Sequence, residues 1–203
     1  MMRNTIMAVM VSLLGMVALW AGTDGFHAYT SEGALRYSIA KHPVRLPDVT
    51  LQDQNGNRFS LASLGGKHVL FTFFYARCGD VCPALETQFK RVIDGISESY
   101  KGKDIVFLSV SFDPEHDDPD TLKHVADYYQ ADGANWRIVT VPDREQLQTL
   151  LTVCNVVAIP NKQDGYEHNA AIYAMDREQK LTHIFDYNMP DTVVRNVMTL
   201  LQA

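Results

Sequence analysis

The chain has 203 residues, of which 46% are hydrophobic and 21% are charged, and its formal net charge is −6. This length suffices for one compact domain with a short appendage. The acidic balance, without any run of Lys and Arg, argues against a nucleic-acid partner. Three cysteines are too few for a small domain held together by disulfides.

The first 22 residues are predicted to be a membrane anchor or signal segment, in which a single basic residue, Arg3, precedes an apolar run. Its uninterrupted part, Ile6 to Trp20, is long for the core of a signal peptide and short for a spanning helix. No small-x-small cleavage site is evident, and Trp20 suits a membrane interface. We therefore expect an uncleaved anchor in a bacterial cell envelope, with the domain facing the periplasm or outside. The alternative is a cleaved signal and a soluble periplasmic protein.

Residues 23–45 mix polar and small residues and are predicted to be a tether, and the domain is predicted over 46–203. It opens with two alternating runs around Asn55-Gly56, a strong hairpin signal. An apolar run at 69–75 predicts a buried strand, and helical spacing follows over 84–93. Further elements are predicted in the order strand 105–111, helix 119–129, strand 136–140, helix 142–153, strands 170–175 and 181–185, and helix 191–201. This α/β order implies a mixed sheet and a thioredoxin-like plan with an N-terminal β-hairpin extension.

Cys78 and Cys82 lie between the strand at 69–75 and the helix that follows it. Free backbone N–H groups and the helix dipole favour a thiolate at such a position. A four-residue offset puts both sulfurs on one face of a helical turn, where they can share a disulfide or a metal ion. The alternative is a pair of buried structural cysteines. For Cys154, in a predicted helix, we expect a small core residue.

Among seven histidines, His168 stands out because it comes directly before the strand at 170–175. In a thioredoxin-like sheet the loop that enters this strand lies against the cysteine turn, so an imidazole there can reach both sulfurs. The alternative is an ordinary surface histidine. Two soft sulfurs and one imidazole make a three-coordinate site suited to Cu(I), and a further oxygen or nitrogen ligand would allow Cu(II). Zinc would normally need a fourth protein ligand.

Three motifs together resemble the Sco/SenC family of copper-binding, thioredoxin-like proteins over most of residues 46–200. They are Cys78-Gly-Asp-Val-Cys-Pro83, Ser111-Phe-Asp-Pro-Glu-His-Asp-Asp-Pro119 and Glu167-His-Asn-Ala-Ala-Ile-Tyr173. The resemblance implies one N-terminal anchor, Cys78 and Cys82 as copper ligands and redox-active thiols, and His168 as the third ligand. It also implies a role in assembling the copper centre of cytochrome c oxidase, with the copper-bearing subunit or another copper or thiol client as partner. Gly79 and Asn169 depart from the residues that many relatives carry there.

Two functions follow from this interpretation. The first is a metallochaperone, not an enzyme in the turnover sense, which passes copper to an acceptor by ligand exchange. The alternative is a thiol–disulfide oxidoreductase acting outside the cytoplasm, in which Cys78 attacks a client disulfide, Cys82 resolves the mixed disulfide and Arg77 helps to hold the thiolate. A thiol peroxidase is a poor fit, because Tyr75 stands where that class carries a threonine. A sensor of copper or redox state has no signature in the sequence.

Overall fold

The computed structural model describes residues 2–23, 30–79, 81–160 and 166–202, without the side chains of residues 2, 3, 31, 160, 167 and 168. The chain divides into two units, Met1–His42 and Pro43–Ala203. The second unit begins at Pro43, where the sequence analysis placed the start of the domain at residue 46. The two units are described separately below.

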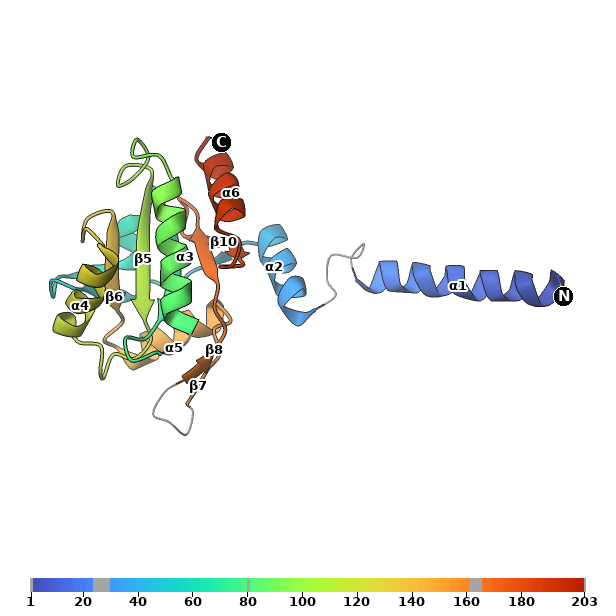
Figure 1. Ribbon diagram of the computed structural model, residues 1–203, viewed down its shortest axis with the longest axis horizontal. Coiled ribbons are helices and arrows are strands. Elements are labelled where there is room, and N and C mark those ends of the chain that lie inside the picture. Colours follow the sequence, from blue (N-terminus) through green and yellow to red (C-terminus); the bar gives the residue numbers. More distant parts are fainter. Residues whose placement is uncertain (1, 24–29, 80, 161–165, 203) are drawn as a thin grey trace. The chain divides into compact units, whose positions relative to one another are not determined.

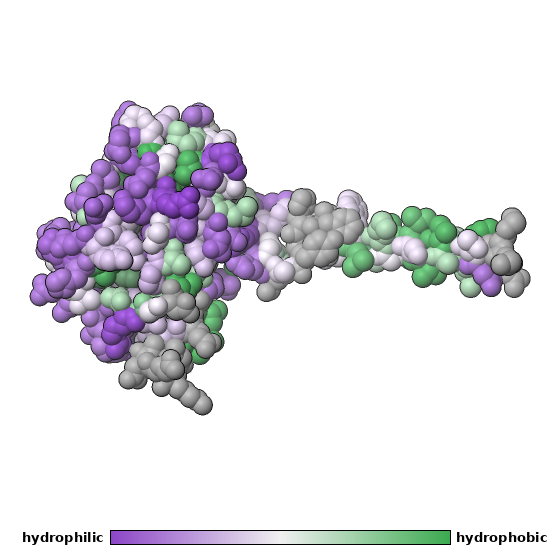
Figure 2. Space-filling view, in the orientation of Figure 1, coloured by the Kyte–Doolittle hydropathy of each residue, from purple (hydrophilic) through white to green (hydrophobic). Residues whose placement is uncertain are grey.

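The described residues of the first unit form two helices, α1 (Met2–Gly22) and α2 (Ser31–Lys41). Within Asn4–Gly22, a window of 18 residues has a mean hydropathy of 2.0, so by length and composition this helix is able to cross a membrane. Its surface is apolar along most of its length in Figure 2. The helix α2 was not expected within the predicted tether. It forms because the Thr30 hydroxyl caps its start and Glu32 pairs with Arg36 one turn later, at 2.6 Å.

The second unit is built on an eight-stranded mixed sheet with the order β1-β10-β9-β4-β5-β6-β2-β3. The strands are β1 (Val44–Arg45), β2 (Thr50–Asp53), β3 (Arg58–Ser60), β4 (His68–Phe74), β5 (Ile105–Ser111), β6 (Trp136–Thr140), β9 (Ile172–Met175) and β10 (Lys180–Phe185). The central strands β4, β5 and β6 are parallel, and their neighbours are antiparallel. The predicted N-terminal hairpin is confirmed as β2–β3, with Gly56 at a φ of 78° in its turn.

Helices cover both faces of this sheet (Figure 1). They are α3 (Val81–Gly95), α4 (Pro119–Tyr129), α5 (Arg144–Val153) and α6 (Pro190–Gln202), with a short 3-10 helix, η1 (Leu61–Leu64). Helices α3 and α6 lie side by side, so closely that a Cβ atom on Gly95 would stand 2.8 Å from the Val194 side chain. On the opposite face, Leu150 of α5 packs near Leu108 and Val110 of β5. The arrangement is the thioredoxin-like α/β architecture that the element order predicts.

A second, two-stranded sheet joins β7 (Ala158–Pro160) to β8 (Tyr166–His168), and it is not part of the eight-stranded ladder. The sequence analysis predicted only a loop entering the strand at 170–175. The backbone of His168 instead lies in β8, opposite Ala158. The segment was missed because strands of three residues, one ending in proline, give too short a pattern to recognise.

A buried carboxyl group, Glu86 on α3, lies against the sheet with an exposed fraction of 0%. It accepts a hydrogen bond from the Thr72 hydroxyl at 2.7 Å and another from the Ser109 hydroxyl at 2.6 Å. Ser109 in turn accepts one from the indole N–H of Trp136 at 3.0 Å. Burial raises the pKa of Glu86 to about 7, and the two hydroxyl donors only partly oppose this.

This raised pKa predicts how the stability of the domain depends on pH. The folded state binds the Glu86 proton more tightly than the unfolded state, so its contribution to stability falls as pH rises from about 4.5 through about 7. Glu86→Gln removes this titration. We expect the difference in unfolding free energy, variant minus native chain, to increase by a few kcal/mol as pH rises from 5 to 8. The reason is that the native chain loses stability over this range and that one pKa unit corresponds to about 1.4 kcal/mol. Urea unfolding of both proteins in the same detergent at several pH values measures this difference. A difference that does not depend on pH would contradict the prediction.

Candidate metal centre

The two cysteines lie on either side of the start of α3. Cys78 belongs to the loop after β4 and is partly exposed, whereas Cys82 is in the first turn of α3 and only 3% exposed. The Cys82 N–H donates a hydrogen bond to the Cys78 sulfur, with a nitrogen–sulfur distance of 3.3 Å. Both residues are free thiols. The predicted placement of the pair between a strand and a helix is therefore confirmed.

The two thiols differ in their electrostatic environment. Burial, followed by the neighbouring Cys78 sulfur, raises the pKa of the Cys82 thiol, and the backbone of Tyr75 acts in the opposite direction. Cys82 therefore keeps its proton at neutral pH in the metal-free protein. A soft metal ion or a disulfide exchange at this pair has to displace that proton.

The cysteine loop is supported by a second loop, which connects β5 to α4. Asp117 is fully buried, and its Oδ2 accepts hydrogen bonds from the Ala76 N–H at 3.0 Å and from the Ser111 hydroxyl at 2.5 Å. Ser111 also accepts one from the Asp113 N–H at 3.1 Å. Burial raises the pKa of Asp117. This support was missed, although two Asp residues four apart directly after a buried strand are a signal that could have found it.

The side chain of Arg77, next to Cys78, is directed to this second loop. Its Nη2 lies 3.1 Å from Oδ2 of Asp113, a carboxyl group that is almost completely buried. His116 Nδ1 lies 2.9 Å from the other oxygen of Asp113. The guanidinium that the sequence analysis considered for holding a Cys78 thiolate is thus engaged by a carboxylate.

Three aromatic rings join the cysteine loop to the β7–β8 hairpin. Tyr75, Phe112 and Tyr166 contact one another in pairs, each with a centroid distance of 5.3 Å. The Tyr75 hydroxyl accepts a hydrogen bond from the Tyr166 N–H at 3.1 Å. The backbone of His168, two residues beyond Tyr166, therefore belongs to a strand that is bonded to the cysteine loop.

The His168 side chain lies outside the described part of the chain, so its role as a ligand stays a prediction. Among the side chains that are described, no three His, Cys, Asp or Glu residues are grouped closely enough to hold a metal ion. The structure thus brings Cys78 and Cys82 together and places the strand of His168 beside their loop.

Asn169 fixes the other end of β8. Its Oδ1 accepts a hydrogen bond from the Val157 N–H at 2.9 Å, and its Nδ2 donates one to the Asn155 carbonyl at 3.1 Å. Asn155 has a φ of 52°, so the chain turns sharply there after α5. A residue that the sequence analysis noted only as a departure from the family pattern thus anchors the hairpin that carries His168.

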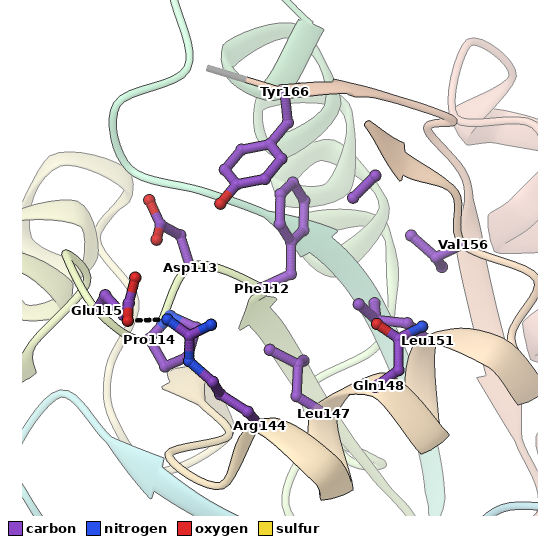
Figure 3. Close-up of a pocket in the computed structure, with 11 residues that line it drawn as sticks. Phe112, Asp113, Pro114, Glu115, Arg144, Leu147, Gln148, Leu151, Val156 and Tyr166 are labelled. Atoms are coloured by element: carbon purple, nitrogen blue, oxygen red, sulfur yellow. Dashed lines mark ion pairs between the residues drawn. The ribbon is translucent and has the colours of Figure 1, made fainter. Parts of the chain in front are cut away.

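A cavity of about 230 Å³ opens beside the aromatic cluster (Figure 3). Phe112, Tyr166 and Leu147 form part of its wall, and an ion pair between Arg144 and Glu115 lies at its edge. No sequence pattern indicated this cavity, because its walls come from four separate segments of the chain.

Together these features define a thioredoxin-like protein with a dithiol at a helix start and a histidine-bearing strand held beside it, a candidate for soft-metal or thiol–disulfide chemistry. The family model described as SCO1/SenC matches residues 42–202, and the chain belongs to this family.

Similarity to individual proteins agrees with this assignment. The chain is 28% identical over 143 residues to the SCO1 protein homolog of Bacillus subtilis, covering 68% of this chain and 71% of the relative. It spans about half the length of some other curated relatives that it matches. The structure of Bradyrhizobium japonicum ScoI with copper bound is 26% identical, with a TM-score of 0.65, over 77% of this chain and 98% of that one. A SCO1/SenC family lipoprotein from Bacillus anthracis, at 22% identity, has the same fold with a TM-score of 0.71 over 80% of this chain and 99% of that one.

The difference in burial predicts the order in which the thiols react. With iodoacetamide at pH 8, Cys78 should be alkylated at least tenfold faster than Cys82 or Cys154, because the latter two are buried and burial raises the pKa of both. Peptide mass spectrometry after timed quenching measures each site. Alkylation in urea provides the control in which all three become equivalent, and equal native rates would contradict the described burial.

Proposed function

We propose that this protein carries copper through Cys78, Cys82 and His168 and delivers it during assembly of the copper centre of cytochrome c oxidase. The observation that supports this most directly is the bond between Tyr75 and Tyr166, which joins the strand of His168 to the cysteine loop. Membership of the SCO1/SenC family and the copper-bound state of the ScoI relative support the choice of metal.

The donor set suits copper in its reduced state. Two thiolates and one imidazole are soft ligands that favour Cu(I), and a further oxygen or nitrogen ligand would be needed for Cu(II). Copper is the cargo, so it has to leave again. Because Cys78 is the more exposed thiol, incoming ligands of an acceptor reach it first, while buried Cys82 keeps its bond longest. Both thiols must be reduced before loading, which couples copper binding to redox state.

The helix α1 is proposed to anchor the protein in the cell-envelope membrane, with residues 43–203 outside the cytoplasm. Its apolar stretch of 19 residues supports this, and a cleaved signal is the alternative. The acceptor would then be the copper-bearing subunit of the oxidase or another copper or thiol client on the same side of the membrane.

A second candidate function is reduction of a client disulfide, which the unequal exposure of the two thiols favours. The Cys78 thiolate attacks one client sulfur and releases the other as a thiolate. Cys82 loses its proton and attacks the Cys78 sulfur, which releases the second client thiolate. Two electrons have then passed to the client, and the chain holds a disulfide that a thiol reductant of the cell envelope must reduce. This reaction needs no histidine, so His168 variants separate the two functions.

Copper titration tests the ligand set. Reduced full-length chain in detergent micelles should bind one Cu(I), and His168→Ala should weaken binding at least tenfold in competition with a Cu(I) chelator, because one of three ligands is lost. Cys78→Ser should abolish tight one-to-one binding.

His124→Ala, which removes an exposed imidazole on α4, is the matched control and should bind as the native chain does. Affinity that is indifferent to His168 would contradict the proposed site.

A further inference from the structure

The β7–β8 hairpin is joined to the rest of the domain by side chains, not by strand pairing. Its two strands form a sheet of their own, and the eight-stranded ladder does not extend to them. Among the described side chains, two make hydrogen bonds to the backbone at the ends of this hairpin. Asn169 binds the Asn155–Val157 turn, and Tyr75 binds Tyr166.

The Tyr75 contact lies at a point where the hairpin cannot bond itself completely. Tyr166 is opposite Pro160 in the register, and proline has no N–H, so it cannot donate a hydrogen bond to the Tyr166 carbonyl across the ladder. The Tyr75 hydroxyl accepts a hydrogen bond from the Tyr166 N–H at 3.1 Å. It donates one to the Tyr166 carbonyl oxygen at 3.5 Å. One oxygen atom of the protein core thus serves both backbone groups of the first residue of β8.

The same residue also shapes the cysteine loop through its backbone. The Cys78 N–H donates a hydrogen bond to the Tyr75 carbonyl at 3.2 Å, which closes the turn that leads from β4 to the first thiol. Tyr75 is 95% buried, and its ring packs against Phe112 and Tyr166. The side chain therefore cannot swing away from the hairpin without disturbing the cluster of three rings.

We propose that Tyr75 is a positioning residue of the metal centre, whose hydroxyl fixes the strand of His168 against the cysteine loop. This inference rests on the proposed function, because it assumes that His168 is a ligand. The hydroxyl reduces the freedom of β8 before the metal arrives, so less ordering remains to be done on binding. Its removal loosens the strand that carries the third ligand.

The test is a double-mutant cycle of Tyr75→Phe and His168→Ala, read as Cu(I) affinity in chelator competition with the full chain in detergent micelles. Tyr75→Phe should weaken binding about three- to tenfold, which corresponds to the net worth of one hydrogen bond. In the His168→Ala background the same substitution should have no further effect, because the ligand that it positions is absent.

Tyr128→Phe is the control, since it removes the hydroxyl of an exposed tyrosine on α4 and keeps the ring. It should leave copper affinity unchanged. Native affinity in Tyr75→Phe, together with weakened binding in His168→Ala, would overturn the positioning role and leave the proposed function standing. An equal loss in both backgrounds would also overturn it, because Tyr75 would then act on Cys78 directly. Unchanged affinity in His168→Ala would overturn the ligand set itself, and the inference with it.

Discussion

The hydrogen bond from the backbone N–H of Cys82 to the Cys78 sulfur joins the first turn of α3 to the thiol in the preceding loop. It exists because a central strand, buried on both faces, ends at Phe74 and the next helix begins at Val81. The first N–H groups of a helix have no carbonyl partner within it, so a sulfur atom can accept one of them. The same geometry leaves one thiol partly exposed and buries the other. The expected order of alkylation, the proposed order of ligand exchange and the proton cost of the proposed metal binding all follow from this difference.

The remaining parts of the site meet the cysteine loop at the carboxyl ends of the parallel strands β4 and β5, where loops of an α/β sheet converge. The loop after β5 supplies Asp117, which holds the backbone at Ala76. The β7–β8 hairpin supplies the backbone of His168 and is bonded to Tyr75 at the end of β4. Two segments that come later in the chain thus fix one short loop.

Much of this architecture can be predicted from the sequence, because it rests on local patterns. The apolar run at 69–75 is a central strand, Asn55-Gly56 forms a hairpin turn, and the cysteine pair lies at the start of a helix. Cys154 is buried, as its apolar neighbours indicated. Each of these features is encoded within about ten consecutive residues.

The parts that could not be predicted depend on contacts between distant segments. The sequence alone suggests that Glu86 is an ordinary surface residue of an amphipathic helix. In the structure its carboxyl group is buried and accepts hydrogen bonds from Thr72 and Ser109 on two strands. The sequence alone suggests that Asp117 is part of a polar turn. In the structure it accepts a hydrogen bond from a backbone N–H of the cysteine loop. The strands β7 and β8 are too short for periodicity to appear, and only their pairing defines them.

The most direct test of the account is X-ray absorption spectroscopy at the copper edge on the Cu(I)-loaded chain. The account predicts a first shell of two sulfur atoms and one nitrogen atom, with the nitrogen lost in His168→Ala. A shell of sulfur alone in the native chain, or one unchanged by the substitution, would contradict the assignment of Cys78, Cys82 and His168 as the metal centre.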